Sequence, residues 1–260
     1  MTTPDYSILD RPEILGFIFY PRVDWTAAPA GASDHLVPVE EGVSISCRFY
    51  FAGLDGPSIL FFHGNGEVSC DYDAIAPMYR KLGLNLFVAD YRGYGQSGGR
   101  PSISHLISDS HAVYRYFREI LRHGRLTGGA LVMGRSLGGY PAIELGCSYQ
   151  GGLRGIIIES GFASIGRLLR NIGFPLQLSG LVEAEEAHMD KVRSIRIPAL
   201  VIHGDRDSLV PLREGEALYA GLGAADKRLV VIEGGGHNDI MLVGREQYFS
   251  AVRDFVGRVS

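Results

Sequence analysis

Apolar residues along the chain occur in short unbroken runs, and longer segments with a helical repeat of apolar positions lie between them. Short unbroken runs predict strands that are buried on both faces. Such runs lie at 58–62, 84–89, 130–133, 155–158, 199–202 and 228–232. The segment 45–51 alternates apolar and polar residues instead, which predicts a strand at the exposed edge of a sheet.

The helical repeats separate these strands in a regular order. They lie at 72–82, 104–122, 137–148, 213–222 and 245–258. Strands that alternate with helices predict an α/β fold, with a mostly parallel sheet and helices on both faces. In such sheets ligands bind beyond the carboxyl ends of the strands, so we expect the functional residues in the loops that follow them.

The segment 161–196 interrupts the alternation, because it contains no predicted strand and only short apolar and acidic stretches. We expect a short lid-like insertion there, in place of a large cap. No proline-rich or serine-rich linker divides the 260 residues, so we expect a single domain over residues 1–260.

Charge and cysteine content remove several classes of function. A net charge of −4 offers no basic surface for a nucleic-acid backbone, so we expect no nucleic-acid partner. The three cysteines form no CxxC pair, which argues against a disulfide scaffold or a zinc site. The apolar run 14–20 is too short to span a bilayer, and the first residues lack a secretory signal pattern. We therefore expect no membrane segment and a cytoplasmic location.

The clearest chemical motif is Gly134-Arg-Ser136-Leu-Gly138, which follows one predicted strand and precedes a predicted helix. A serine nucleophile on such a sharp turn needs small neighbours, and the strand–turn–helix setting is the one this motif requires. The serine would then stand at a helix N-terminus whose free N–H groups face a developing oxyanion. A glycine-rich turn with an incidental serine is the alternative that this motif alone leaves open.

The loop His63-Gly-Asn65-Gly66-Glu follows the strand 58–62, where a hydrolase with such a serine takes its second oxyanion donor. We expect the backbone N–H of Asn65 to act with that of Leu137, although Gly66 could replace Asn65. For His63 we expect a structural role that holds the loop.

A serine hydroxyl becomes a good nucleophile only when a histidine oriented by a carboxylate accepts its proton. Asp205 and Asp207 follow the strand 199–202, and His237 follows the strand 228–232. This chain order, serine then acid then histidine, is the one that the motif requires, and all three groups would meet at one edge of the sheet. We expect Ser136 as nucleophile and His237 as general base.

Five segments together carry a resemblance to a known family: HGNGE, DYRGYGQSGG, GRSLGG, HGDRDSLVP and GGGHND. They resemble the single-domain serine hydrolases of the α/β-hydrolase fold, nearest to the branch of depalmitoylating thioesterases and its bacterial relatives. The resemblance extends from Val39 to the C-terminus. It implies the α/β-hydrolase fold, cleavage of an ester or thioester through an acyl-enzyme, and Asp207 rather than Asp205 as the acid of the triad.

Other interpretations of the same residues remain. An aminopeptidase or amidase of this fold would need an acidic group for the substrate amine, and the cluster 183–186 is the candidate. The fold also hosts inactive binding proteins. The spacing Gly93-x-Gly-x-x-Gly98 matches a dinucleotide motif, but Pro101 follows where a phosphate-binding helix would run, so we expect no cofactor. A triad explains Asp207, so we also expect no metal.

The substrate is the least defined part of this interpretation. Phe162 in the insertion, and Ile240 and Met241 just after His237, are apolar residues close to the expected site. We expect them to line a small apolar pocket for a short- to medium-chain acyl ester or thioester.

Overall fold

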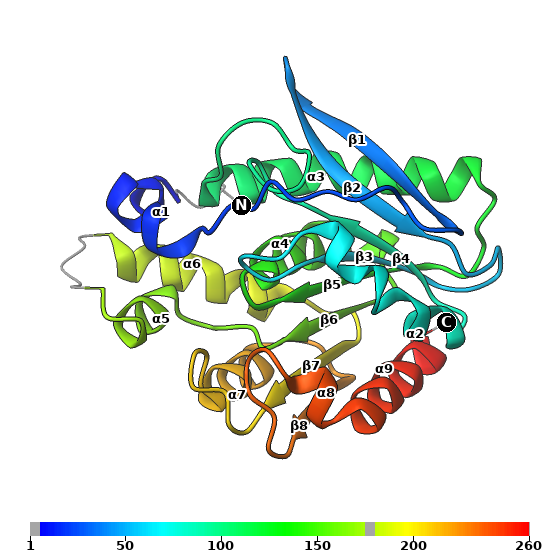
Figure 1. The fold of residues 1–260 in the computed structure, drawn as a ribbon. Coiled ribbons are helices and arrows are strands. Elements are labelled where there is room, and N and C mark those ends of the chain that lie inside the picture. Colours follow the sequence, from blue (N-terminus) through cyan, green and yellow to red (C-terminus); the bar gives the residue numbers. More distant parts are fainter. Residues whose placement is uncertain (1–5, 175–179, 260) are drawn as a thin grey trace.

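The computed structural model describes residues 6–174 and 180–259 (Figure 1). Within these ranges the strands form one eight-stranded sheet in the order β1-β2-β4-β3-β5-β6-β7-β8. The strands are β1 (Ala32–Glu40), β2 (Val43–Tyr50), β3 (Ser58–Phe62), β4 (Asn85–Ala89), β5 (Ala130–Arg135), β6 (Gly155–Glu159), β7 (Ala199–Gly204) and β8 (Lys227–Ile232). The pairs β1–β2 and β2–β4 are antiparallel and the other neighbours are parallel, so the mostly parallel α/β sheet is confirmed.

Helices cover both faces of this sheet. They are α1 (Pro12–Ile18), α2 (Ala76–Lys81), α3 (Ile103–His123), α4 (Gly139–Ser148), α5 (Ile165–Asn171), α6 (Leu181–Ser194), α7 (Leu212–Gly221), α8 (Ile240–Val243) and α9 (Arg245–Val259). Alternate residues of β3 separate the two cores: Leu60 and Phe62 pack with residues of α3 and α4, whereas Ile59 and Phe61 pack with residues of α2 and α9. Burial on both faces explains the unbroken apolar runs in the strands.

The expected edge strand 45–51 is instead the second strand of the sheet. β1 pairs along its whole length with β2, and the two-residue turn Glu41-Gly42 joins them, with Gly42 at a φ of +73°. As a result β2 is buried from Ile45 to Tyr50, and β1 forms the edge. Only Val37 of β1 is buried, and Leu36 is exposed, so this edge strand has no regular alternation of buried and exposed positions.

The segment 161–196 contains α5 and α6 and lies between β6 and β7. Residues 175–179 of this segment are outside the described residues, and its described part contains no strand. α6 packs on α4, and the N-terminal α1 lies beside α5 and α6 at one end of the sheet (Figure 1). The sequence pattern did not predict α1 or its position.

Candidate active site

The side chains of Ser136, His237 and Asp207 form a hydrogen-bonded series at the carboxyl ends of β5, β8 and β7. Ser136 Oγ lies 3.0 Å from His237 Nε2, and His237 Nδ1 lies 2.7 Å from Asp207 Oδ2. A carboxylate only accepts hydrogen bonds, so Nδ1 carries the proton and the lone pair of Nε2 faces the serine hydroxyl. All three residues are at most 9% exposed. The structure thus brings together three residues that the sequence analysis selected from three separate loops.

The backbone at Ser136 explains why glycines surround it. Ser136 has a φ of +53°, in the left-handed region that ordinary residues avoid. A Cβ atom on Gly134 would lie 2.1 Å from the carbonyl oxygen of Gly138, and one on Gly138 would lie 2.1 Å from that of Phe62. Only glycine allows these three backbone segments to approach so closely, and this approach holds the serine at the tip of the turn.

Two aspartates in the loop after β7 have different partners. Asp207 accepts the backbone N–H groups of Leu209 and Val210 through Oδ1, at 3.0 and 2.7 Å, which leaves Oδ2 for His237. Asp205 accepts the backbone N–H of Gly234 at 2.7 Å and is exposed. Asp205 therefore ties together the loops after β7 and β8, and only Asp207 reaches the histidine.

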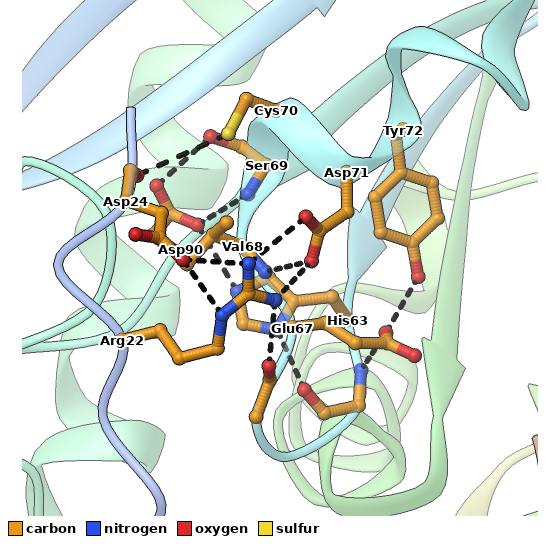
Figure 2. Close-up of polar contacts among 12 residues, drawn as sticks. Arg22, Asp24, His63, Glu67, Val68, Ser69, Cys70, Asp71, Tyr72 and Asp90 are labelled. Carbon is orange, nitrogen blue, oxygen red and sulfur yellow. Dashed lines mark hydrogen bonds and ion pairs between the residues drawn. The ribbon is translucent and has the colours of Figure 1, made fainter. Parts of the chain in front are cut away.

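The loop 63–67 lies beside the serine turn, since a Cβ atom on Gly138 would lie 2.8 Å from the carbonyl oxygen of His63. Buried polar contacts hold the conformation of this loop (Figure 2). The ring of His63 contacts the carbonyl oxygen of Gly64 at 2.8 Å and the carboxylate of Asp90 at 3.1 Å. Asp90 also accepts hydrogen bonds from the backbone N–H and the hydroxyl of Ser69. His63 is fully buried in these contacts, which fits the structural role that we expected for it.

The residues Asn65 and Gly66 differ in how their polar groups are used. The side-chain oxygen of Asn65 accepts from the hydroxyl of Tyr94 at 2.7 Å and from the backbone N–H of Tyr20 at 2.9 Å. The backbone carbonyl oxygen of Gly66 accepts from the guanidinium of Arg22 at 2.9 Å (Figure 2). Asn65 lines the pocket at Ser136, and Gly66 is not among the described lining residues.

A pocket of about 430 Å³ opens at Ser136. Its polar lining residues are Tyr20, Asn65, Arg135, Ser136, His237 and Asn238, and its apolar ones are Phe17, Ile18, Leu137, Phe162, Leu168, Ile172 and Leu209. α1 and α5 therefore both supply apolar walls, and the ring of Phe17 meets that of Phe174 edge-on at 5.0 Å between centroids. The wall from α1 carries no sequence signal that separates it from an ordinary amphipathic helix.

Of the three residues expected to contact substrate, Phe162 lines the pocket and the other two lie elsewhere. Ile240 is 2% exposed in the core beneath the opposite face of the sheet, and Met241 packs against the same core. The short helix α8 places these side chains in the core that also contains Ile232 and Tyr248. This placement corrects the expectation that Ile240 and Met241 form part of an acyl pocket.

Two further findings concern the described residues as a whole. Within residues 6–174 and 180–259, no three side chains of histidine, cysteine, aspartate or glutamate gather as a metal ion would require. No helix in the same ranges has the length and apolar character needed to cross a membrane.

The fold and this arrangement define the class of α/β-hydrolases. The chain belongs to the hydrolase family described as serine aminopeptidase, S33, whose model matches residues 57–177 and 168–241. It is 30% identical to α/β-hydrolase domain-containing protein 17B of Homo sapiens, over 86% of this chain and 74% of that protein. It is also 31% identical to the uncharacterized protein Rv2307c of Mycobacterium tuberculosis, over 88% of this chain and 80% of that protein.

Solved structures agree on the fold. The Pyrococcus furiosus esterase Pf2001 matches with a TM-score of 0.76 and 21% identity, over 93% of this chain and 97% of that one. Est1E from Butyrivibrio proteoclasticus matches with a TM-score of 0.69 and 18% identity, over 86% and 98%. The expected resemblance and the α/β-hydrolase fold are confirmed.

Proposed function

We propose that this hydrolase cleaves a carboxylic ester or thioester with Ser136 as nucleophile, His237 as general base and Asp207 as the acid that orients the histidine. The observation that carries the proposal is the series of hydrogen bonds of 3.0 and 2.7 Å that joins these side chains. The position of Ser136 supports this proposal, because the serine lies on a strained turn that lines a pocket. Its hydroxyl could therefore attack the carbonyl carbon of a substrate bound there.

The chemistry follows from these positions. Ser136 Oγ forms a bond to the carbonyl carbon while its proton passes to His237 Nε2, and Asp207 stabilises the imidazolium. The N–H groups of Leu137 and Asn65 bind the oxyanion. When the carbon–oxygen or carbon–sulfur bond of the ester or thioester breaks, His237 returns the proton to the leaving group. A water molecule then releases the acyl group by the same two steps.

We assign the second oxyanion donor to Asn65 rather than Gly66. Gly66 is not among the described residues that line the pocket, and its carbonyl oxygen accepts from Arg22. Asn65 lies in the pocket lining, with its side chain held by Tyr94 and the backbone of Tyr20. We further propose that 161–196 is a lid-like insertion of a single domain, since Phe162, Leu168 and Ile172 of this segment line the pocket.

The pocket favours an acyl substrate over a substrate with a free amine. An aminopeptidase needs a carboxylate near the scissile bond, and the described pocket lining contains none. In the cluster 183–186, Glu183 and Glu186 are exposed, and Glu185 bonds to Ser164 and to the backbone N–H of Gly166. This acidic cluster is therefore engaged at α5 or solvated.

A fluorophosphonate probe tests the proposed function directly, because it modifies only an activated serine. We expect the protein to be labelled and to hydrolyse nitrophenyl butyrate, and Ser136→Ala to lose both activities while it keeps its circular dichroism spectrum and melting temperature. An unlabelled wild-type protein would instead support an inactive binding protein of this fold.

A further inference from the structure

Arg135, the residue before the nucleophile, occupies an unusual position at the end of β5. Its side chain is buried behind Ser136, and its guanidinium contacts four acceptors. Nη1 pairs with Glu67 Oε1, and Nε pairs with Glu159 Oε1 at 3.2 Å. Nη2 donates to the backbone carbonyl of His237 at 2.7 Å and to the side-chain oxygen of Asn238 at 3.0 Å. One side chain thus contacts the loops after β3 and β8 and the end of β6.

Both carboxylate partners of Arg135 are held by further hydrogen bonds. Glu67 accepts the backbone N–H of Gly64 at 2.7 Å and the hydroxyl of Tyr72 at 2.9 Å (Figure 2), so the carboxylate that binds Arg135 also closes the turn that contains Asn65. Glu159 accepts the hydroxyl of Tyr248 at 2.6 Å. A Cβ atom on Gly64 would lie 2.2 Å from Arg135 Nη1, so the guanidinium lies directly against this turn.

A contribution to stability does not by itself explain a buried arginine with these ion pairs. The guanidinium of Arg135 lies between the carboxylates of Glu67 and Glu159 in the interior of the protein. Burial there raises the pKa of Glu159. Removing these charges from water has a large cost, and well-packed apolar residues often stabilise a core equally well. An apolar side chain, however, cannot donate hydrogen bonds, so it cannot bind a peptide carbonyl and a carboxylate at the same time.

We propose that Arg135 is a positioning residue that holds the His237 loop and the Asn65 turn in one fixed geometry around Ser136. This inference rests on the proposed function. In this proposal Arg135 fixes the distance between His237 Nε2 and the serine hydroxyl, and it also fixes the direction of the Asn65 N–H. Both geometries matter most in the transition state, so the loss of Arg135 lowers kcat and leaves KM nearly unchanged.

The test compares Arg135→Gln and Arg135→Lys with Arg92→Gln. Arg92 is the matched control, because it is 7% exposed against 5% for Arg135 and also lies between two carboxylates, Glu40 and Asp109. Neither of these partners contacts the site. The measurements are kcat and KM for nitrophenyl butyrate, taken where circular dichroism shows each variant to be folded.

We expect Arg135→Gln to lower kcat about 10-fold to 100-fold, because a displacement of catalytic groups by about 1 Å costs up to about 100-fold in rate. Lysine keeps the charge but not the planar fork, so Arg135→Lys recovers part of the loss. Arg92→Gln keeps the wild-type kcat. Wild-type kcat in Arg135→Gln, or an equal loss in Arg92→Gln, overturns the inference.

The proton resonance of His237 Nδ1 gives a readout independent of turnover, since its hydrogen bond to Asp207 shifts it downfield. We expect it to broaden or move in Arg135→Gln and to stay unchanged in Arg92→Gln. If Arg135→Gln does not fold, Glu67→Gln, which cuts the same ion pair at its other end, replaces it in both measurements. If the fluorophosphonate probe does not label the wild-type protein, the proposed function is contradicted but the role of Arg135 is not. If the His237 Nδ1 resonance is unchanged in Arg135→Gln, the role of Arg135 is overturned.

Discussion

Asp205 and Asp207 stand two residues apart in one loop, yet their carboxylates face different partners. Two backbone N–H groups hold one oxygen of Asp207 and orient the other toward His237. The carboxylate of Asp205 accepts only the backbone N–H of Gly234 among the described residues and faces solvent. The difference comes from the direction in which the loop presents each side chain, which residue type alone does not encode.

Substitution of each aspartate by asparagine separates these roles. In Asp207→Asn the amide can donate to His237 Nδ1 and stabilise the tautomer that cannot accept the serine proton, so we expect kcat/KM to fall about 10³-fold to 10⁴-fold. In Asp205→Asn the amide oxygen still accepts from Gly234, so we expect a change of less than about threefold. Measured kcat/KM values in the reverse order would show that Asp205 is the triad acid.

α6 is held on α4 by contacts along one face. The ring of His188 stacks on that of Tyr140 with centroids 4.1 Å apart and planes 9° from parallel, and Lys191 forms an ion pair with Glu144. Burial, together with the charge of Lys191, lowers the pKa of His188 to about 3. His188 is therefore neutral in the folded protein at neutral pH, and protonation of this side chain opposes the association of the two helices.

His188 gives α6 a defined dependence on pH. Below about pH 6.5 the unfolded chain protonates this histidine and the folded protein does not, so its contribution to stability is complete above that pH and is lost progressively down to about pH 3. Between pH 6.5 and pH 5 this one group lowers the free energy of unfolding by about 2 kcal/mol.

Urea unfolding of His188→Asn at pH 7 and pH 5 measures this contribution. We expect the variant to lose about 2 kcal/mol less than the wild type between the two pH values. The window lies above the titration of most carboxylates, including Glu144, whose pKa is lowered to about 2. His123→Asn, at an exposed position on α3, should behave like the wild type. Equal losses in the wild type and in His188→Asn would show that His188 is charged in the fold.

Over the whole molecule, the pocket is built from segments that are far apart in the chain. Phe17 and Ile18 come from α1, Leu168 and Ile172 from α5 and its end, and Leu209 from the loop after β7. The resulting volume of about 430 Å³ is at the small end of the range for ligand pockets. Its apolar walls suit an acyl chain of limited length.

A series of nitrophenyl esters of increasing acyl length tests this pocket. Each methylene that still finds wall to contact contributes about 0.8 kcal/mol, which is up to fourfold in kcat/KM. We expect kcat/KM to rise over the first few carbons and then to level off at short to medium chains. Ile172→Ala should make the rise less steep, and Val182→Ala, at an exposed position on α6, should not. Rates that still climb at palmitoyl length would mean a deep tunnel.

The positions of most strands and helices were predictable, because burial on both faces and the helical repeat are properties of neighbouring residues. The segment predicted as a helix at 245–258 is α9, Arg245–Val259, and the strand at 58–62 is β3. The residues of the candidate site were predictable from the sequence for a similar reason. In a parallel sheet, residues that follow different strands meet at one edge, so chain order predicted that Ser136, His237 and one of the aspartates Asp205 and Asp207 would lie together. The family resemblance then selected Asp207.

Only the tertiary structure decided which face of the sheet each apolar residue joins. Ile240 and Met241 follow the histidine, yet α8 directs them into the core opposite the pocket, and α1 supplies the wall in their place. The contact between Phe17 and Phe174 joins residues 157 positions apart, and a local pattern contains no information on such pairs. The sequence by itself determined most of the elements and the candidate triad, whereas α1, the pocket walls and the contacts of Arg135 depend on long-range packing.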